Sequence, residues 1–265
     1  MATALTRVAV YERSLHASIE RAWENVRDWE HLPWLHSGSF RSIELVEEAG
    51  WGWKARIGLH PADGPEILLE LVIESDRRYV SRTLEGVGAG SEIWTRLVPR
   101  AADRTDVRVE FLLPDVEPDA AERIGAGYAA LYTRLWDEDE AMMQRRSAEL
   151  AQRAGRVGGV RSDPLELGPV ATLRERLPLI VEFAGRPFRI VADGESFYAH
   201  STVCPHRLGP LADCPVDAGA LRCPWHGYRF DARSGEQLSP TGRLRLAPAP
   251  QVEIAAGQAR LVPRR

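Results

Sequence analysis

The sequence predicts two domains of different fold class, an α+β domain over residues 1–151 and a small all-β domain over residues 167–265. Three observations lead to this prediction. The first half alternates strand-like segments and closes with one long helical segment, whereas the second half carries short strand-like runs. Between them lies a stretch rich in Gly and Arg without periodicity, which predicts a linker over residues 152–166. A chain of 265 residues is long enough to bury two cores.

The elements of the first half follow from apolar periodicity and turn residues. Ser18 can cap a helix whose apolar residues then recur at helical spacing. Alternating segments separated by Gly, Pro and Asp predict antiparallel strands, and a broad apolar stripe predicts the closing helix. We expect strands over 7–15, 42–47, 50–59, 66–75, 78–84, 92–98 and 105–112, and helices over 19–29 and 118–151.

The second half is expected to begin with strands over 179–183, 187–191 and 196–200, ahead of a Cys/His pattern. Cys204 and His206 form Cys-x-His, sixteen residues follow, and Cys223 and His226 form Cys-x-x-His. Two thiolates and two imidazoles in two short tips can hold a [2Fe–2S] cluster, with the thiolates on one iron and the imidazoles on the other. Structural zinc is the alternative, although zinc sites usually pair two Cys in one half.

The segment after the second tip strengthens the cluster interpretation. Residues 227–231 read GYRFD and Ser234-Gly235 follow, which resembles the corresponding segment of Rieske ferredoxins and oxygenases. Rieske proteins of the respiratory type carry an additional Cys in each tip, and this chain lacks that pair. Cys214, which lies between the two tips, is therefore expected to be a free thiol without a chemical role.

The order of elements in the first half resembles the helix-grip fold of the START and SRPBCC superfamily. That resemblance implies a long helix lying across a curved sheet, with a cavity between them that suits an apolar ligand. Aromatic residues that could line the cavity are Trp34, Trp51, Trp53, Tyr128 and Tyr132.

The segment 24–36, ENVRDWEHLPWLH, suggests a second metal centre. Two His close in sequence can present both imidazoles to one metal, and a facial triad of two His and one carboxylate holds mononuclear Fe(II). The segment resembles the catalytic domain of Rieske non-haem iron oxygenases, in which this pattern supplies iron ligands. The resemblance implies that His31 and His36 bind iron and that Asn25 lies near it.

The third ligand must come from elsewhere, and in that family it comes from the long closing helix. The acidic run 137–140 offers four carboxylates. At about 100° per residue, Asp139 falls within the apolar stripe, Glu138 lies at its margin, and Asp137 and Glu140 point away. A carboxylate on a buried stripe is costly unless it is paired or metal-bound. Asp139 is therefore the expected ligand and Glu138 the second choice, with a solvated acidic run as the structural alternative.

The same resemblance implies how the two centres would work together. Asp28 would bridge an iron ligand, His31, and a cluster ligand, expected to be His226. A reductase or ferredoxin fed by NAD(P)H would supply electrons, and iron would activate O₂ to oxidise a small or medium organic substrate. A homotrimer is implied by analogy only. The chain departs from the family because its helix-grip domain precedes the Rieske domain.

Composition limits the remaining possibilities. A net charge of −4 does not suggest nucleic acid or an anionic membrane as partner. No apolar run approaches the roughly 18 residues of a membrane helix. The unpaired Cys and the absence of a recognisable signal peptide favour a reducing cytoplasm. The alternative function is a Rieske electron-transfer protein fused to a START-like ligand-binding or cyclase domain without mononuclear iron, and the substrate is open under both readings.

Overall fold

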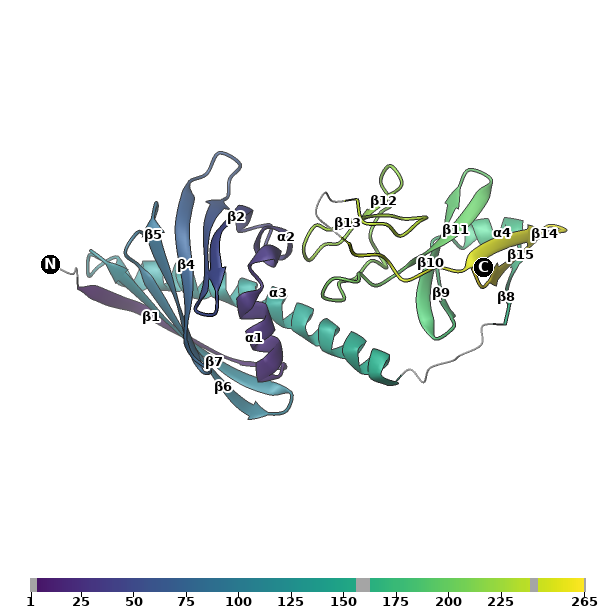
Figure 1. Cartoon of the computed structure of the whole chain (residues 1–265). Coiled ribbons are helices and arrows are strands. Elements are labelled where there is room, and N and C mark those ends of the chain that lie inside the picture. The colour runs from purple at the N-terminus through teal and green to yellow at the C-terminus, as the bar shows by residue number, and fades with distance from the viewer. Residues whose placement is uncertain (1–3, 156–162, 239–242, 265) are drawn as a thin grey trace. The chain divides into compact units, whose positions relative to one another are not determined.

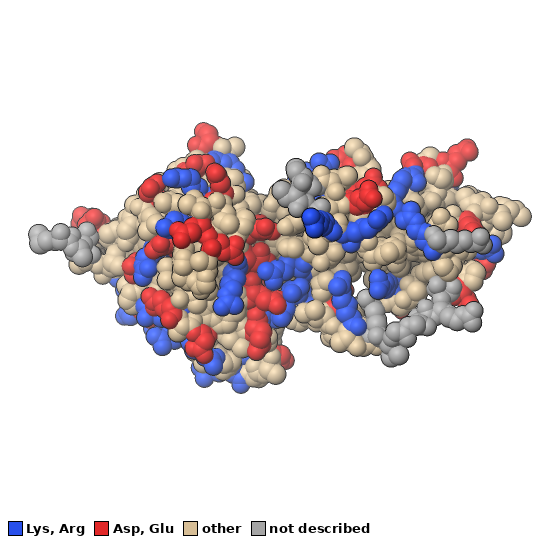
Figure 2. All heavy atoms as spheres, viewed as in Figure 1, with Lys and Arg blue, Asp and Glu red and all other residues tan. Residues whose placement is uncertain are grey.

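The computed structural model describes residues 4–155, 163–238 and 243–264 (Figure 1). The chain divides into two compact units, Met1–Ser147 and Ala148–Arg265. Within the described residues, no helix is both long and apolar enough to cross a membrane. Figure 2 shows acidic and basic side chains interspersed on the visible face of the first unit, as expected for a small net charge.

The first unit is built on one antiparallel sheet of seven strands. Their order across the sheet is β1-β7-β6-β5-β4-β3-β2, so that β1 pairs with the last strand of the unit and every other pair is a sequential hairpin. The strands are β1 Leu5–Leu15, β2 Phe40–Ala49, β3 Gly52–Leu59, β4 Glu66–Ser75, β5 Arg78–Glu85, β6 Glu92–Ala101 and β7 Arg104–Pro114.

Three short helical segments connect β1 to β2. Helix α1, Ile19–Arg27, begins at Ser18, whose hydroxyl accepts a hydrogen bond from the Arg21 backbone amide, as the sequence predicts. The 3₁₀ turn η1, Trp29–His31, and the single-turn helix α2, Leu32–Leu35, follow at once. Pro33 stands in the first turn of α2, where its missing N–H costs nothing.

The long helix α3, Ala121–Gly155, lies across the concave face of the sheet (Figure 1). The helix approaches β1 closely at Gly125, where a Cβ atom would stand 2.3 Å from the Val8 carbonyl oxygen. Fully buried side chains fill the space between α3 and the sheet. They include Leu15, Ile57, Leu97, Val107, Val109, Phe111, Trp136 and Met143.

The second unit contains small antiparallel sheets. Strands β9 Leu179–Phe183, β10 Arg186–Asp193 and β11 Ser196–Ser201 form one sheet, and β14 Gln251–Ala255, β15 Gln258–Val262 and β8 Leu165–Pro169 form another. Strands β12 Ala220–Arg222 and β13 Arg229–Asp231 make a short hairpin, and helix α4 is Val170–Glu175. The core of the second unit includes Leu173, Phe188, Ile190 and Leu261.

The predicted fold class, an α+β helix-grip unit followed by a small all-β unit, is confirmed. Most element boundaries differ by two to four residues at one end or both. The helix expected over 19–29 ends at Arg27 and passes into a 3₁₀ turn, and the strand expected over 92–98 continues to Ala101. The closing helix was expected over 118–151, and it begins three residues later and continues to Gly155, because Gln152, Arg153 and Ala154 are good or neutral helix formers. Residues 152–155 of the predicted linker are therefore helical, and residues 156–162 lie outside the described residues.

Candidate metal centres

His31, His36 and Asp139 converge in the first unit although they come from three elements. His31 ends η1, His36 follows the last residue of α2, and Asp139 lies in α3. Their nearest ligand atoms all lie within 4.8 Å of one another. Asp139 Oδ1 is 3.1 Å from His36 Nε2 and 3.5 Å from His31 Nε2. All three side chains are buried, with His36 the most enclosed.

The local fold explains how two His five residues apart share one point. The turn η1 and the single turn of α2 reverse the chain, and the backbone amide of His36 bonds the Leu32 carbonyl oxygen at 3.2 Å. The two imidazole rings then lie 5.1 Å apart between centroids, at 72° to each other.

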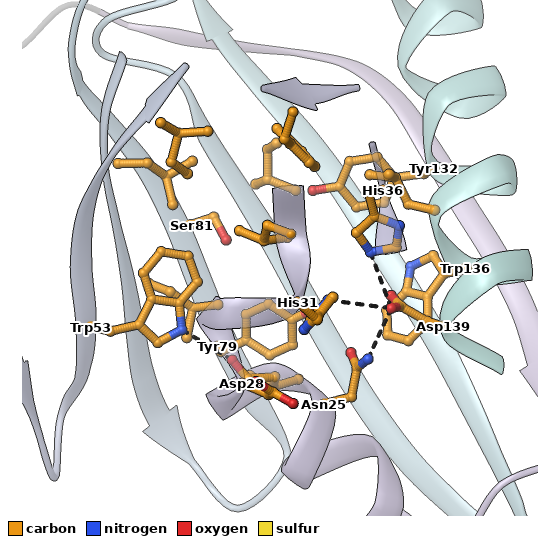
Figure 3. A pocket seen from close by; sticks show the side chains of 18 residues that line it. Asn25, Asp28, His31, His36, Trp53, Tyr79, Ser81, Tyr132, Trp136 and Asp139 are labelled. Carbon is orange, nitrogen blue, oxygen red and sulfur yellow. Dashed lines mark hydrogen bonds and ion pairs between the residues drawn. The ribbon is translucent and has the colours of Figure 1, made fainter. Parts of the chain in front are cut away.

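Two polar side chains hold the group in place. Glu138 Oε2 lies 2.6 Å from His36 Nδ1, so the other ring nitrogen, Nε2, faces Asp139. Asn25 donates from Nδ2 to Asp139 Oδ1 at 2.8 Å, which orients that carboxylate (Figure 3). Glu138, the second choice for the metal carboxylate, thus contacts the outer nitrogen of His36. Partners of this kind fix the tautomer of a metal-ligating His.

The charges within the group support one another. Burial by itself would raise the pKa of the Asp139 carboxyl, but hydrogen bonds and positive charge from His31 and His36 outweigh it and hold that pKa below its usual range. Burial would lower the pKa of His36, but the carboxylates of Asp139 and Glu138 raise it overall. A buried carboxylate thus depends on cationic neighbours, a dependence that a bound divalent cation would also satisfy.

The donor set fits mononuclear Fe(II). Two imidazole nitrogens and one carboxylate oxygen on one side of a metal are the facial triad of non-haem iron sites, which leaves positions open for other ligands. Here the donors are buried, convergent and pre-oriented by Glu138 and Asn25. Iron binding by His31, His36 and Asp139 remains a prediction that this geometry favours.

The triad lies at one end of a cavity of about 140 Å³ between the sheet, α1, α2 and α3 (Figure 3). Of the aromatic residues proposed from the sequence, Trp53 and Tyr132 line this cavity, whereas Trp34, Trp51 and Tyr128 are not among its lining residues. Asp28, the predicted bridging residue, also lines it and is buried where α1 ends.

Tyr79 and Ser81 on β5 also line the cavity, and neither was expected from the sequence. Their signal was the alternation along β5, which places both on the same face of the sheet. Pairing then aligns Ser81 with Leu71 of β4 and Ile93 of β6. The alternation alone does not identify cavity residues, because the strand order decides which side chains lie beside Tyr79 and Ser81.

The remaining two carboxylates of the acidic run lie outside the cavity lining, but one of them is buried. Asp137 is mostly exposed and pairs with Arg13 at 2.6 Å. Glu140 points away from the cavity, as expected, but it is buried against the end of β1 and not solvated. It accepts hydrogen bonds from Arg13 and from the backbone and ring of His16. This cluster ties α3 to β1 and stands apart from the triad.

The second unit carries the other Cys/His group on two short tips. The first tip closes with a hydrogen bond from the Cys204 amide to the Gly209 carbonyl at 2.8 Å, and the second with one from Cys223 to Tyr228 at 2.9 Å. Cys204 and Cys223 are completely buried. The rings of His206 and His226 lie 4.5 Å apart between centroids and nearly perpendicular. The four candidate ligands, which come from two tips sixteen residues apart, therefore gather at one place.

The two thiols are close enough to share a proton. Their mutual hydrogen bond raises the pKa of Cys204 and lowers that of Cys223. Gly209 allows this close packing, because a Cβ atom there would stand 2.6 Å from Cys223 Sγ. Two adjacent thiols and two adjacent imidazoles fit the donor set of a Rieske cluster.

Cys214 lies near the two tip cysteines but has a hydrogen-bond partner of its own. Its thiol contacts the Pro210 carbonyl oxygen at 3.4 Å, and burial raises its pKa to about 11. All three cysteines lack disulfide partners among the described residues. A protonated, half-buried thiol agrees with the expectation that Cys214 is a free thiol.

Comparison with known proteins identifies sequence similarities mainly for the second unit. The family model described as Rieske [2Fe-2S] domain matches residues 163–250. Ferredoxin CarAc of Metapseudomonas resinovorans is 28% identical over 72 residues, which covers 27% of this chain and 66% of the ferredoxin. Apoptosis-inducing factor 3 of Homo sapiens is 36% identical over 56 residues, 21% of this chain and 9% of that protein. Each match therefore covers only part of the curated relative.

For the first unit, a similar solved structure is a START superfamily protein from Mycobacterium smegmatis. It is 15% identical and covers 51% of this chain and 96% of its own, with a TM-score of 0.44. The strand order and the long helix across the sheet give the first unit its helix-grip arrangement. The second unit matches the Rieske [2Fe-2S] domain over residues 163–250.

Proposed function

We propose that this protein is the oxygenase component of a Rieske-type non-haem iron system. The observation that carries the proposal is the convergence of His31, His36 and Asp139 at one end of a cavity, in a chain that also has a Rieske domain. A one-electron centre and a buried site for mononuclear iron are the two parts that such an oxygenase needs. Similarity of the second unit to a ferredoxin supports its role in electron transfer.

Bound at the triad, Fe(II) would supply the activation of O₂, with one or two oxygen atoms entering the substrate and any remaining oxygen leaving as water. The electrons would come from NAD(P)H through a separate reductase or ferredoxin. The protein's own residues would hold the metal, shape the cavity and keep bulk water out. Asn25 would keep Asp139 turned toward the metal, since it already donates to that carboxylate.

Asp28 is the proposed link between the two centres. Its carboxylate is buried at the end of α1, three residues before His31. A carboxylate there would orient His31 and connect it to a cluster ligand such as His226. The variant Asp28→Asn is expected to keep its full iron content and lose most substrate oxidation. Loss of iron in this variant would instead indicate a purely structural role.

Iron stoichiometry and spectroscopy test the main proposal. Wild-type protein is expected to hold three irons per chain, two in the cluster and one at the triad. His31→Ala and His36→Ala should each hold two irons, keep the visible spectrum of the cluster and lose oxidation of added organic substrates. His60→Ala, an exposed His in the same unit, is the matched control and should hold three.

The alternative function has a clear signature in the same experiment. A Rieske electron-transfer protein fused to a ligand-binding unit would hold two irons, bind no added Fe(II) and show the same metal content in both His variants. That result would overturn the oxygenase proposal. It would leave the electron-transfer role of the second unit intact.

A further inference from the structure

The cavity of the first unit has polar side chains besides those of the triad. The hydroxyl groups of Ser81, on β5, and Tyr132, on α3, both point into the enclosed space (Figure 3). Neither hydroxyl has a hydrogen-bond partner among the described residues. An unpartnered hydroxyl in an apolar enclosure costs free energy, so it is normally satisfied by a ligand or by ordered water.

The row of side chains across the sheet shows that Ser81 is unusual. Strand pairing aligns Trp53, Leu71, Ser81, Ile93 and Phe111 on successive strands. Ser81 is the polar member of a row that is otherwise apolar or aromatic. An apolar residue at this position would bury more surface against α3, so packing alone gives no reason for a hydroxyl.

Tyr132 provides the second hydroxyl from the opposite layer. It precedes Asp139 by seven residues, so the two lie about 10 Å apart along the axis of α3. Its ring is held in an edge contact by Phe111, with centroids 4.8 Å apart. Burial, and the nearby tyrosines and Asp139, raise its pKa well above the usual range, so the phenol stays protonated and can donate.

The rest of the lining limits charge and size. Away from the triad the wall is formed by apolar side chains such as Leu32, Phe40, Ile57 and Leu69, and no Lys or Arg is among the described lining residues. A carboxylate held by Ser81 and Tyr132 would have no cationic partner among the other described residues of that wall. The volume of about 140 Å³ is close to the roughly 150 Å³ of an engineered apolar cavity that binds benzene.

We propose that the cavity binds a neutral, single-ring-sized apolar molecule carrying one hydroxyl or carbonyl group, which Ser81 and Tyr132 hold by hydrogen bonds. This inference deepens the proposed function, because it names the class of molecule that the site at His31, His36 and Asp139 would oxidise. Ser81 and Tyr132 would set specificity for the polar substituent. They would not touch the metal.

Binding of three matched probes tests the inference. The probes are 4-methylphenol, toluene and 4-methylbenzoate, measured by calorimetry on the whole protein without O₂ or reductant, so that no turnover occurs. We expect 4-methylphenol to bind at least tenfold more tightly than toluene, and 4-methylbenzoate to bind more weakly than either. Ser81→Ala and Tyr132→Phe should each weaken 4-methylphenol about five- to tenfold and change toluene less than about twofold.

Thr133→Ala is the matched control. Thr133 is the next residue of α3, is exposed, and bonds the Ala129 carbonyl oxygen at 2.9 Å, so its loss should leave all three affinities unchanged. Wild-type affinity for 4-methylphenol in both Ser81→Ala and Tyr132→Phe would overturn the inference. Equal or tighter binding of 4-methylbenzoate, or no binding of any probe, would also overturn it.

The same titrations on His31→Ala separate this inference from the proposed function. The oxygenase proposal fails and the ligand class stands if wild-type protein holds only two irons but still binds 4-methylphenol more tightly than toluene, with the preference lost in Ser81→Ala and Tyr132→Phe. If three irons and substrate oxidation are found while the two hydroxyls have no effect on binding, the ligand class fails and the oxygenase proposal stands.

Discussion

Removal of the Glu138 carboxylate should weaken metal binding at the proposed site of His31, His36 and Asp139, although Glu138 is not one of the proposed ligands. Glu138 Oε2 lies 2.6 Å from His36 Nδ1, while His36 Nε2 faces Asp139. Without Glu138, the ring loses the acceptor that fixes its tautomer and orientation. Loss of such an outer partner typically weakens metal binding about 10–100-fold.

The exposure of Glu138 places the expected effect within that range. Its side chain is 35% exposed, so water can partly replace the carboxylate as acceptor. We therefore expect Glu138→Ala to weaken Fe(II) binding about tenfold, which corresponds to about 1.4 kcal/mol. Glu138→Gln keeps an acceptor oxygen and should recover most of this loss. Asp139→Ala removes a ligand and should cost more than about a hundredfold.

Anaerobic titration with Fe(II), or with Co(II) as a coloured probe, measures these affinities on protein whose cluster is intact. The visible spectrum of the cluster should be the same in every variant. Asp137→Ala, the exposed neighbour in the acidic run, is the control and should bind metal as the wild type does. Unchanged affinity in Glu138→Ala would refute the orienting role. A loss as large as that in Asp139→Ala would show that Glu138 is itself a ligand.

Three further predictions concern the cluster and the stability of the first unit. Gly209→Ala should strongly reduce cluster absorbance per chain, because the new Cβ would lie 2.6 Å from Cys223 Sγ, and full loading would contradict this packing. Glu140→Gln should destabilise the protein by about 1–3 kcal/mol at pH 7 in urea unfolding. Burial alone would raise the pKa of Glu140, but hydrogen bonds from His16 and Arg13 lower it overall. The stabilisation that the Glu140 carboxylate provides is therefore present above the ordinary carboxyl pKa. It is lost as pH falls through the pKa of Glu140 in the folded protein. The difference between Glu140→Gln and wild type should therefore shrink in acid, and a constant difference would refute the linkage. Leu97→Ala should cost about 3 kcal/mol by the same assay, since Leu97 is fully buried, and a cost below about 1 kcal/mol would show that the core can collapse around it.

Short-range patterns in the sequence were sufficient for much of the fold. Helix α1 begins at Ser18 because its hydroxyl satisfies a backbone donor, a local interaction that the residue types announce. The ends of β4 and β9 match the expected residues 66–75 and 179–183, since Gly, Pro and Asp bound those runs. Helix α3 continues four residues past the expected end, where propensity is neutral and no stop signal occurs before Gly155.

The candidate metal residues show where sequence patterns stop being sufficient. The sequence could predict that His31 and His36 lie close together, because only one tight turn separates them. The choice of Asp139 over Glu138 rested on helical periodicity, and the structure places both against His36 at different nitrogens. Periodicity distinguishes the faces of a helix, but it does not say which atom of a neighbouring ring each face meets.

The order of the two units, most elements of the first unit and the donor types of both candidate metal centres could be predicted, because they depend on local periodicity and on residue chemistry. The burial of Glu140 against Arg13 and the position of Ser81 and Tyr132 on one cavity follow from tertiary packing. That packing also decides that Glu138 supports His36 from outside the triad. Such contacts join residues roughly 50 to 130 positions apart, and they form only when strand pairing and the packing of α3 fix the register between elements.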